Sequence, residues 1–276
     1  MHSQHLILYS KKLVLLALLL LFSFKYLIAQ ENDNNNTLDF YIGYHFNKTQ
    51  DLVFSPLIYQ GASFNGLGIR YENVSKRALS QLSFFYDKIE VSHNTPISSP
   101  VFGQRAPSES QLFDLKLGYA FSLKQSEDFQ WYVGGIFEAK YLATDFIFGL
   151  GVEESYLYEN TLSPWLLISY QLNQSYQLQA QAHVNLISLV SRPEYSIVDN
   201  RNIQGEEGLK YLYNKAEIVL PGGGFQSYNL AIKFSRALSS RIDVFGQYQL
   251  NYWRVDKPET LSVLKNNFGL GLSFNF

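Results

Sequence analysis

The stretch NNFGLGLSFNF, residues Asn266–Phe276, carries the clearest structural pattern in the sequence. Large apolar side chains occupy every second position, namely Phe268, Leu270, Leu272, Phe274 and Phe276. The positions between them hold Asn, Gly or Ser. Because successive side chains of a β-strand point to opposite faces, the stretch predicts a strand with one apolar face and one polar face.

The same residues resemble the closing strand of bacterial outer-membrane β-barrels, in which a terminal Phe and alternate hydrophobic residues are recognised by the barrel-assembly machinery. The resemblance to small outer-membrane barrels extends over residues 37–276 and points to no finer family. It implies that the five apolar residues form an assembly signal. It also implies the outer membrane of a Gram-negative cell as the location, with outer-membrane lipid and the assembly machinery as partners.

The composition agrees with a membrane barrel. The 276 residues include 20 Tyr and 21 Phe, and aromatic residues form girdles at both lipid–water interfaces of such barrels. The mean hydropathy of −0.10 does not argue against a membrane location, because an alternating strand hides its apolar face in an average. A soluble all-β sandwich with an aromatic core is the alternative.

The amino terminus predicts a secretory signal peptide. Lys11 and Lys12 precede an apolar run, Leu13–Phe24, that is too short to span a bilayer. Ala29 offers a small residue for cleavage. We therefore expect residues 1–29 to be removed, residues 30–36 to form a polar segment, and residues 37–276 to form the barrel.

Charge and cysteine content exclude several functional classes. Removing residues 1–29 takes away three of the 22 basic residues and none of the 24 acidic ones, so no basic excess is left for binding nucleic acid. The absence of cysteine excludes disulfides, thiolate metal sites, a Cys nucleophile and a lipid anchor. We expect a monomer without a cofactor.

Period-two alternation after the signal predicts about ten strands, with eight to twelve as the range. The expected fold is all-β, a closed antiparallel up-and-down transmembrane barrel. The predicted strands are Leu38–Phe46, Phe64–Glu72, Leu79–Ser92, Leu112–Leu123, Phe129–Tyr141, Pro164–Leu172, Tyr176–Val190, Gln226–Ser235, Ile242–Arg254 and Asn266–Phe276. In Leu79–Ser92 the apolar phase switches between Tyr86 and Ile89, which indicates either a bulge or a strand that continues beyond the lipid.

The connections between these strands alternate in length, as they do in outer-membrane barrels. Short polar turns are predicted at Asn73–Ala78, Lys124–Asp128, Asn173–Ser175 and Ala237–Arg241. Longer connections are predicted at Asn47–Ser63, His93–Gln111, Leu142–Ser163, Ser191–Phe225 and Val255–Leu264. An even number of strands places both ends of the barrel on the short-turn, periplasmic side.

Charged residues of both signs fall on the polar faces of the strands and predict a polar network in the lumen. They are Asp39, Arg70, Glu72, Asp114, Lys116, Glu138, Lys140, Lys233 and Asp243. A barrel of eight to ten strands is narrow enough to be filled by side chains, so we expect these charges to pair in a filled lumen. The alternative is a narrow solute channel lined by Lys116, Lys140 and the polar row Gln177, Gln179, Gln181, His183 and Asn185.

No catalytic, cofactor or metal site is predicted. The histidines His45, His93 and His183 lack metal-ligand spacing, and LPGGGF at Leu220–Phe225 reads as a turn or bulge entering a strand. The omptin proteases resemble this chain in strand count and size. Their site requires an Asp-His pair and a further Asp pair, and neither an Asp-x-His nor an adjacent Asp pair occurs here. An envelope hydrolase is therefore the third functional alternative.

The long connections are the expected working surface, because loops on a rigid scaffold commonly carry function. The longest, Ser191–Phe225, contains Arg192, Tyr195, Arg201 and Tyr211, and Tyr and Arg are enriched at binding hot spots. The sequence thus predicts a structural or surface-binding role toward an unknown extracellular ligand.

Overall fold

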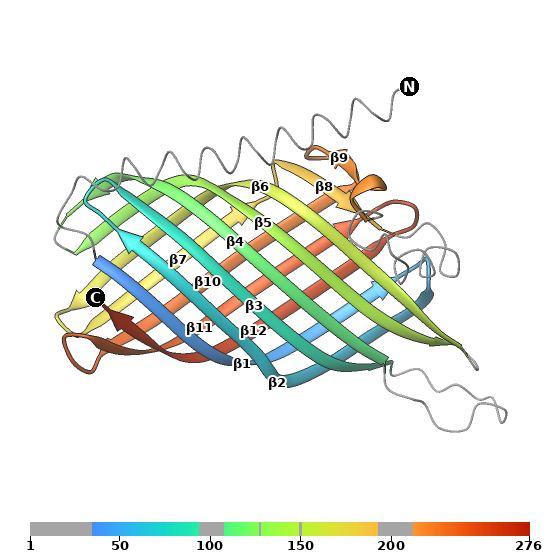
Figure 1. The fold of residues 1–276 in the computed structure, drawn as a ribbon, viewed down its shortest axis with the longest axis horizontal. Coiled ribbons are helices and arrows are strands. Elements are labelled where there is room, and N and C mark those ends of the chain that lie inside the picture. Colours follow the sequence, from blue (N-terminus) through green and yellow to red (C-terminus); the bar gives the residue numbers. More distant parts are fainter. Residues whose placement is uncertain (1–34, 94–107, 127, 149–150, 193–211) are drawn as a thin grey trace.

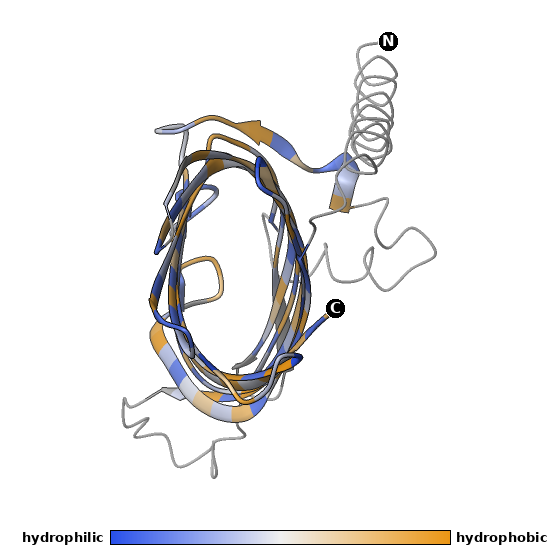
Figure 2. Cartoon of the chain, turned by 90° about the vertical axis from the view of Figure 1, so that its left-hand side faces the viewer, coloured by the Kyte–Doolittle hydropathy of each residue, from blue (hydrophilic) through white to orange (hydrophobic). Residues whose placement is uncertain are grey.

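The strands form one closed antiparallel barrel, oval when viewed along its length (Figure 2). The computed structural model describes residues 35–93, 108–126, 128–148, 151–192 and 212–276. Ten long strands build the wall, each paired with its neighbours in the ring, and the ring closes between the first and last of them (Figure 1). The prediction of a ten-stranded up-and-down barrel is therefore confirmed.

The bounds of the strands are as follows. The wall contains β1 (Asn35–Asp51), β2 (Ser55–Val74), β3 (Ala78–His93), β4 (Ser108–Gln125), β5 (Phe129–Phe148), β6 (Gly151–Asn173), β7 (Tyr176–Val184), β10 (Phe225–Ala237), β11 (Ile242–Val255) and β12 (Leu261–Asn275). Two short strands, β8 (Ile187–Ser191) and β9 (Glu217–Val219), extend the wall beyond β7. Residues 212–214 form a helical turn.

The closing strand pairs with β1 from Thr37↔Asn275 to Asp51↔Leu261. The amide of Phe276 also donates to the carbonyl of Asn36 at 3.0 Å. The predicted apolar face of β12 is exposed on the outside of the barrel, as at Leu270, which is 71% exposed. Whether these residues also act as an assembly signal stays a prediction.

The outer surface has an apolar band bordered by aromatic rings. On β1, Phe40 and Ile42 point outward while Asp39 and Tyr41 are buried inside. Ring pairs lie near both edges of the band, toward the long connections at Tyr44–Phe64, Tyr86–Phe113 and Tyr248–Phe268, and toward the short turns at Phe129–Tyr170 and Tyr176–Phe234. This is the arrangement of a barrel that crosses a lipid bilayer.

Toward the long connections the polarity of the wall inverts. On β3, Tyr86 is followed by the outward residues Lys88 and Glu90, whereas Ile89 and Val91 are buried inside. The β3–β4 register has no shift there. The phase switch predicted from the sequence therefore marks a strand that continues beyond the lipid, not a bulge in that ladder. On this part of β3 the charged side chains face outward and the apolar ones inward, as in a soluble barrel.

Two connections predicted as long loops are strands for most of their length. The segment Leu142–Ser163 is almost entirely the upper part of the β5–β6 hairpin, which pairs as far as Phe148↔Gly151. The segment Asn47–Ser63 is the β1–β2 hairpin, with a turn between Asp51 and Ser55. Those two predictions are wrong because the apolar-outward pattern ends at the lipid, whereas backbone pairing continues above it.

The predicted strand Tyr176–Val190 is split into β7 and β8 at Asn185 and Leu186. At the break, the side-chain amide of Asn185 replaces the missing ladder contacts to β10. Its Oδ1 accepts from the amide of Ser227 at 2.9 Å, and its Nδ2 donates to the carbonyl of Phe225 at 3.3 Å. The predicted turn at Leu220–Phe225 is confirmed, with Gly222 and Gly224 at positive φ, and it inserts extra residues between β9 and β10.

Several inward glycines leave room for rings on the neighbouring strand. A methyl group on Gly68 would overlap the ring of Tyr41, which is buried in the lumen. We predict that Gly68→Ala lowers the free energy of unfolding by about 1–3 kcal/mol, the usual cost of overpacking. Urea unfolding in lipid vesicles measures this value. Gly135→Ala is the control, because the nearest atom to its new methyl group lies at 3.8 Å; an equal loss in both variants would refute the explanation.

Among the described residues, no helix has the length and apolar character needed to cross a membrane.

Candidate functional site

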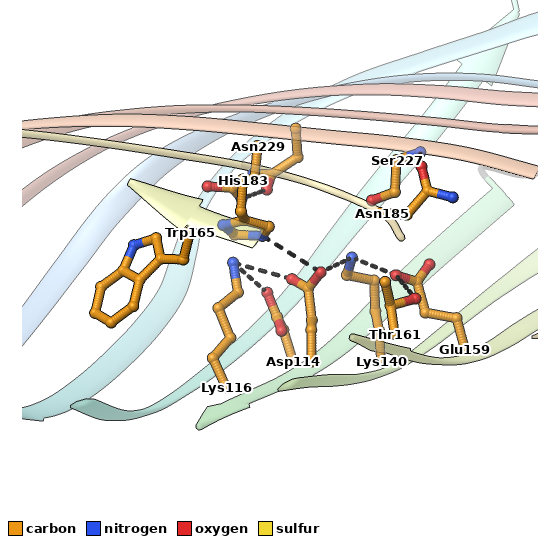
Figure 3. Close-up of polar contacts among 12 residues, drawn as sticks. Asp114, Lys116, Lys140, Glu159, Thr161, Trp165, His183, Asn185, Ser227 and Asn229 are labelled. Carbon is orange, nitrogen blue, oxygen red and sulfur yellow. Dashed lines mark hydrogen bonds and ion pairs between the residues drawn. The ribbon is translucent and has the colours of Figure 1, made fainter. Parts of the chain in front are cut away.

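The middle of the lumen holds a chain of alternating charges centred on Glu138 of β5. Lys116 on β4 contacts Glu138 at 3.0 Å, and Lys140 contacts it at 3.2 Å (Figure 3). The outer ends of the chain are Asp114, 3.2 Å from Lys116, and Glu159, 3.3 Å from Lys140. All five side chains are largely buried. They face one another because they occupy paired or diagonal inward positions on β4, β5 and β6.

Aromatic and polar groups complete this central network. The ammonium of Lys140 lies 4.2 Å from the centre of the Trp253 ring, a cation–π distance. Nε2 of His183 lies 3.6 Å from the Glu138 carboxylate, and Thr161 donates to Glu159 at 3.3 Å (Figure 3). Three carboxylates thus share two lysines. Loss of Lys140 would leave three negative charges facing one positive charge.

A second network surrounds Asp39 of β1. Its carboxylate accepts from Arg70 at 2.6 and 2.9 Å, from Lys233 at 2.6 Å and from the Ser273 hydroxyl at 2.6 Å. Arg70 also lies 3.4 Å from Glu72. This cluster ties β1 and β2, on one side of the closing seam, to β12 and β10 on the other side.

The structure therefore brings eight of the nine predicted lumen charges into these two networks. The ninth, Asp243, lies near the short turns and accepts a hydrogen bond from Asn275 at 3.0 Å. Sequence reasoning missed Glu159 and the buried pair Lys265–Asp87. Glu159 falls in a predicted loop and Lys265 lies just before the predicted closing strand. Extending the period-two count beyond the ends of the predicted strands would have identified Glu159 and Lys265 as inward-facing residues.

Apolar side chains fill the lumen on the long-connection side of the central network. This upper core is fully or nearly buried and consists of Leu112, Leu142, Leu157, Val190, Phe225, Trp253, Val255, Leu261 and Val263. A second apolar cluster, toward the short turns, contains Leu79, Ala120, Tyr132, Ile136, Trp165 and Leu167. The charges consequently lie in an interior with apolar packing on both sides.

A small cavity lies among the side chains in the middle of the lumen. The cavity between the two networks, bordered by Tyr41, Arg70, Asp114 and Gln181, has a volume of about 20 Å³. A water molecule needs about 10–15 Å³ measured in this way, so the cavity holds about one. The polar row on β7 is engaged in the packing, since Gln177 donates to Ser169 at 3.0 Å and Gln181 accepts from Trp165 at 3.2 Å.

At the mouth of the barrel, Asp51 and Arg192 form a buried ion pair between the β1–β2 turn and the end of β8. Ser155 of β6 donates to the Asp51 carboxylate at 2.6 Å from the opposite side of the ring. Arg192 also donates to the carbonyls of Lys257 and Glu259 in the β11–β12 turn. We call Asp51, Ser155 and Arg192 the mouth clasp, because they join segments from across the opening.

The sequence predicts Arg192 on an exposed binding loop, and the structure shows that this prediction is wrong. Arg192 is 8% exposed, and burial lowers the pKa of its guanidinium while the Asp51 carboxylate opposes that shift. The other three residues of the predicted binding loop, Tyr195, Arg201 and Tyr211, lie outside the described residues. The described residues resume at Leu212, which is buried, and Tyr213, whose ring lies 6.5 Å from that of Tyr158 on β6.

The described residues contain no group of three or more His, Asp or Glu side chains placed to hold a metal ion. His45 and His183 point inward as predicted and are buried. His93 lies at the end of β3.

Comparison with known proteins agrees with the fold. No family model matches the chain, and no curated protein matches it in sequence. Among solved structures, it is similar to the outer membrane protease OmpT from Escherichia coli, with a TM-score of 0.53 and 9% identity, covering 88% of this chain and 97% of that one. The translocator domain of the autotransporter NalP from Neisseria meningitidis gives a TM-score of 0.45 and 7% identity, covering 90% of each chain.

The likeness to OmpT extends to the barrel and, at this identity, shows the fold alone. Together with the apolar band and the aromatic rings, it identifies the fold as that of the small outer-membrane β-barrels. It does not transfer a catalytic site.

Proposed function

We propose that this protein is a surface-binding barrel, in which the wall anchors an extracellular rim and the rim contacts a ligand outside the cell. The observation that carries the proposal is the filled interior, with its ionic networks, its upper core and a cavity of only about 20 Å³. Such an interior offers a solute no column of water. The rim, on the side of the longer connections, faces the outside in barrels of this type.

The height of the wall also supports this role. Strands β5 and β6 pair up to Phe148↔Gly151, well above the aromatic ring pairs, and β8 and β9 add a further ladder on the same side (Figure 1). A rigid platform of paired strands reduces the ordering cost when a surface loop binds. The mouth clasp holds the base of the segment that follows Arg192, so that segment starts from a fixed point.

The proposal is tested by deleting residues 193–211, which joins Arg192 to Leu212. We expect a folded barrel that still migrates differently on a gel before and after boiling, because the clasp and the β8–β9 ladder are kept. Cells that display the shortened protein should lose adherence to surfaces coated with extracellular-matrix proteins or polysaccharides to which the full protein confers it.

A deletion in a different connection on the same side of the barrel provides the control. Removing residues 94–107 between β3 and β4 should leave adherence within a factor of about two, since those residues lie on a different connection. Undiminished adherence after removal of 193–211 would reject this connection as the binding surface. If the full protein confers no adherence to any coating, the surface-binding function itself fails.

A further inference from the structure

The lipid-facing surface of the barrel has a notch over β3, β4, β5 and β6. Its volume is about 170 Å³. Outward side chains of Phe84, Phe113, Leu115, Tyr141 and Tyr158 form its walls, and Ala139 lies among them. The notch exists because a methyl group occupies the position between Leu115 and Asn160 in the outward row, where larger side chains surround it.

The notch lies within the apolar band, close to its border with the outer leaflet. Phe84, Phe113 and Leu115 are each exposed by about two fifths on the band, at 43%, 41% and 38%. Two positions beyond Tyr86 on the same face of β3, the polar surface begins at Lys88, which is 2.8 Å from Glu109. The side of the notch nearer the long connections therefore meets the region of lipid headgroups, and the rest of it meets acyl chains.

The floor of the notch is the stretch of the β4–β5 wall that lies directly outside the central network. Asp114 and Lys140 border it, and they are direct partners in the β4–β5 ladder. Their side chains point the other way, into the ion pairs with Lys116 and Glu138. An apolar occupant would complete the wall where the ionic network lies directly behind it, and would keep water from that part of the ladder.

From this geometry we propose that the notch binds one acyl chain of an outer-leaflet lipid, held more firmly than the lipid around it. The lining is apolar and aromatic, and the notch is continuous with the lipid-facing surface. Its volume is close to that of an apolar protein cavity of about 150 Å³ that takes up benzene. A segment of about six methylenes has a similar bulk, so one end of a chain fits. The proposal does not depend on what the rim binds.

Native mass spectrometry can count such a lipid. The purified barrel is mixed with palmitoyl-oleoyl-phosphatidylethanolamine, and bound lipids are counted as collision energy rises. We expect the wild type to keep one lipid at energies that strip Ala139→Phe bare, because the new ring fills the notch. Ala180→Phe is the matched control, since Ala180 also faces lipid, on β7, but does not line the notch. It should keep one lipid as the wild type does.

The outcomes separate the explanations. Equal lipid retention in wild type and Ala139→Phe would overturn the proposal, as would equal loss in Ala139→Phe and Ala180→Phe. A dimer mass that only Ala139→Phe abolishes would show that a second copy of this chain occupies the notch instead. Ala139→Leu fills less space and guards against misfolding of the Phe variant, which heat-modifiable migration reports. A folded Ala139→Leu variant should also lose the retained lipid.

Discussion

Replacing Lys140 with Met is expected to lower the free energy of unfolding by about 3–5 kcal/mol, the cost of breaking a buried ion pair from one side. Lys140 contacts Glu138 at 3.2 Å and Glu159 at 3.3 Å. Without it, the network would hold three buried carboxylates and one lysine, and Glu159 would lose its only ion pair among the described residues. Met has a similar length, so the loss reflects charge more than packing. Equilibrium urea unfolding in short-chain lipid vesicles measures it.

A second substitution should restore part of that loss. Adding Glu159→Gln to Lys140→Met leaves two carboxylates around one lysine and restores the net charge of the wild-type network, so the double variant should be more stable than Lys140→Met alone. The exposed pair Lys88–Glu109 is the control, and Lys88→Met should cost less than about 1 kcal/mol. Equal costs for Lys140→Met and Lys88→Met would mean that the lumen network contributes no more than a surface ion pair.

The mouth clasp predicts the second large effect. Arg192→Met leaves the carboxylate of Asp51 fully buried, with the Ser155 hydroxyl and the amide of Val53 as remaining donors among the described residues. The segments that meet there should open locally at a cost about 3–5 kcal/mol smaller than in the wild type. Amide hydrogen exchange in the β1–β2 turn and the β11–β12 turn should then accelerate by a factor of about a hundred or more.

The change should stay local to the mouth. Amides in the β4–β5 ladder around Asp114 and Lys140 should exchange at the wild-type rate. Arg254→Met removes a comparable side chain from an exposed pair with Asp256 in the same hairpin, and should leave both turns unchanged. Fast exchange in the two turns of the wild-type protein would contradict a closed clasp from the outset.

The sequence is informative about the lower part of this barrel because a lipid environment imposes a strict alternation there. The outward residues Phe40 and Ile42 on β1 and Leu270 and Leu272 on β12 could be assigned from period two alone. The inward charges followed from the same count. A strand count of ten and the alternation of short and long connections were sufficient to derive the topology.

The upper part of the barrel obeys a different rule and was predicted less well. Beyond the lipid, Lys88 points outward and Ile89 inward, so a search for apolar-outward strands stops too early. The partners of Arg192 could not be derived either, because Asp51, Lys257 and Glu259 are distant from it in sequence and meet it only when the ring closes. Buried charge pairs across a barrel depend on register and tilt, which composition does not encode.

Whether the lumen is filled is tested most directly by recording current across planar bilayers that contain the wild-type protein. Heat-modifiable migration of the same preparation establishes that the barrels are folded. We predict a baseline without discrete conductance steps at saturating protein, because the upper core and the mouth clasp close the interior and the central cavity holds about one water. Reproducible steps of uniform size from the folded wild type would contradict the filled lumen.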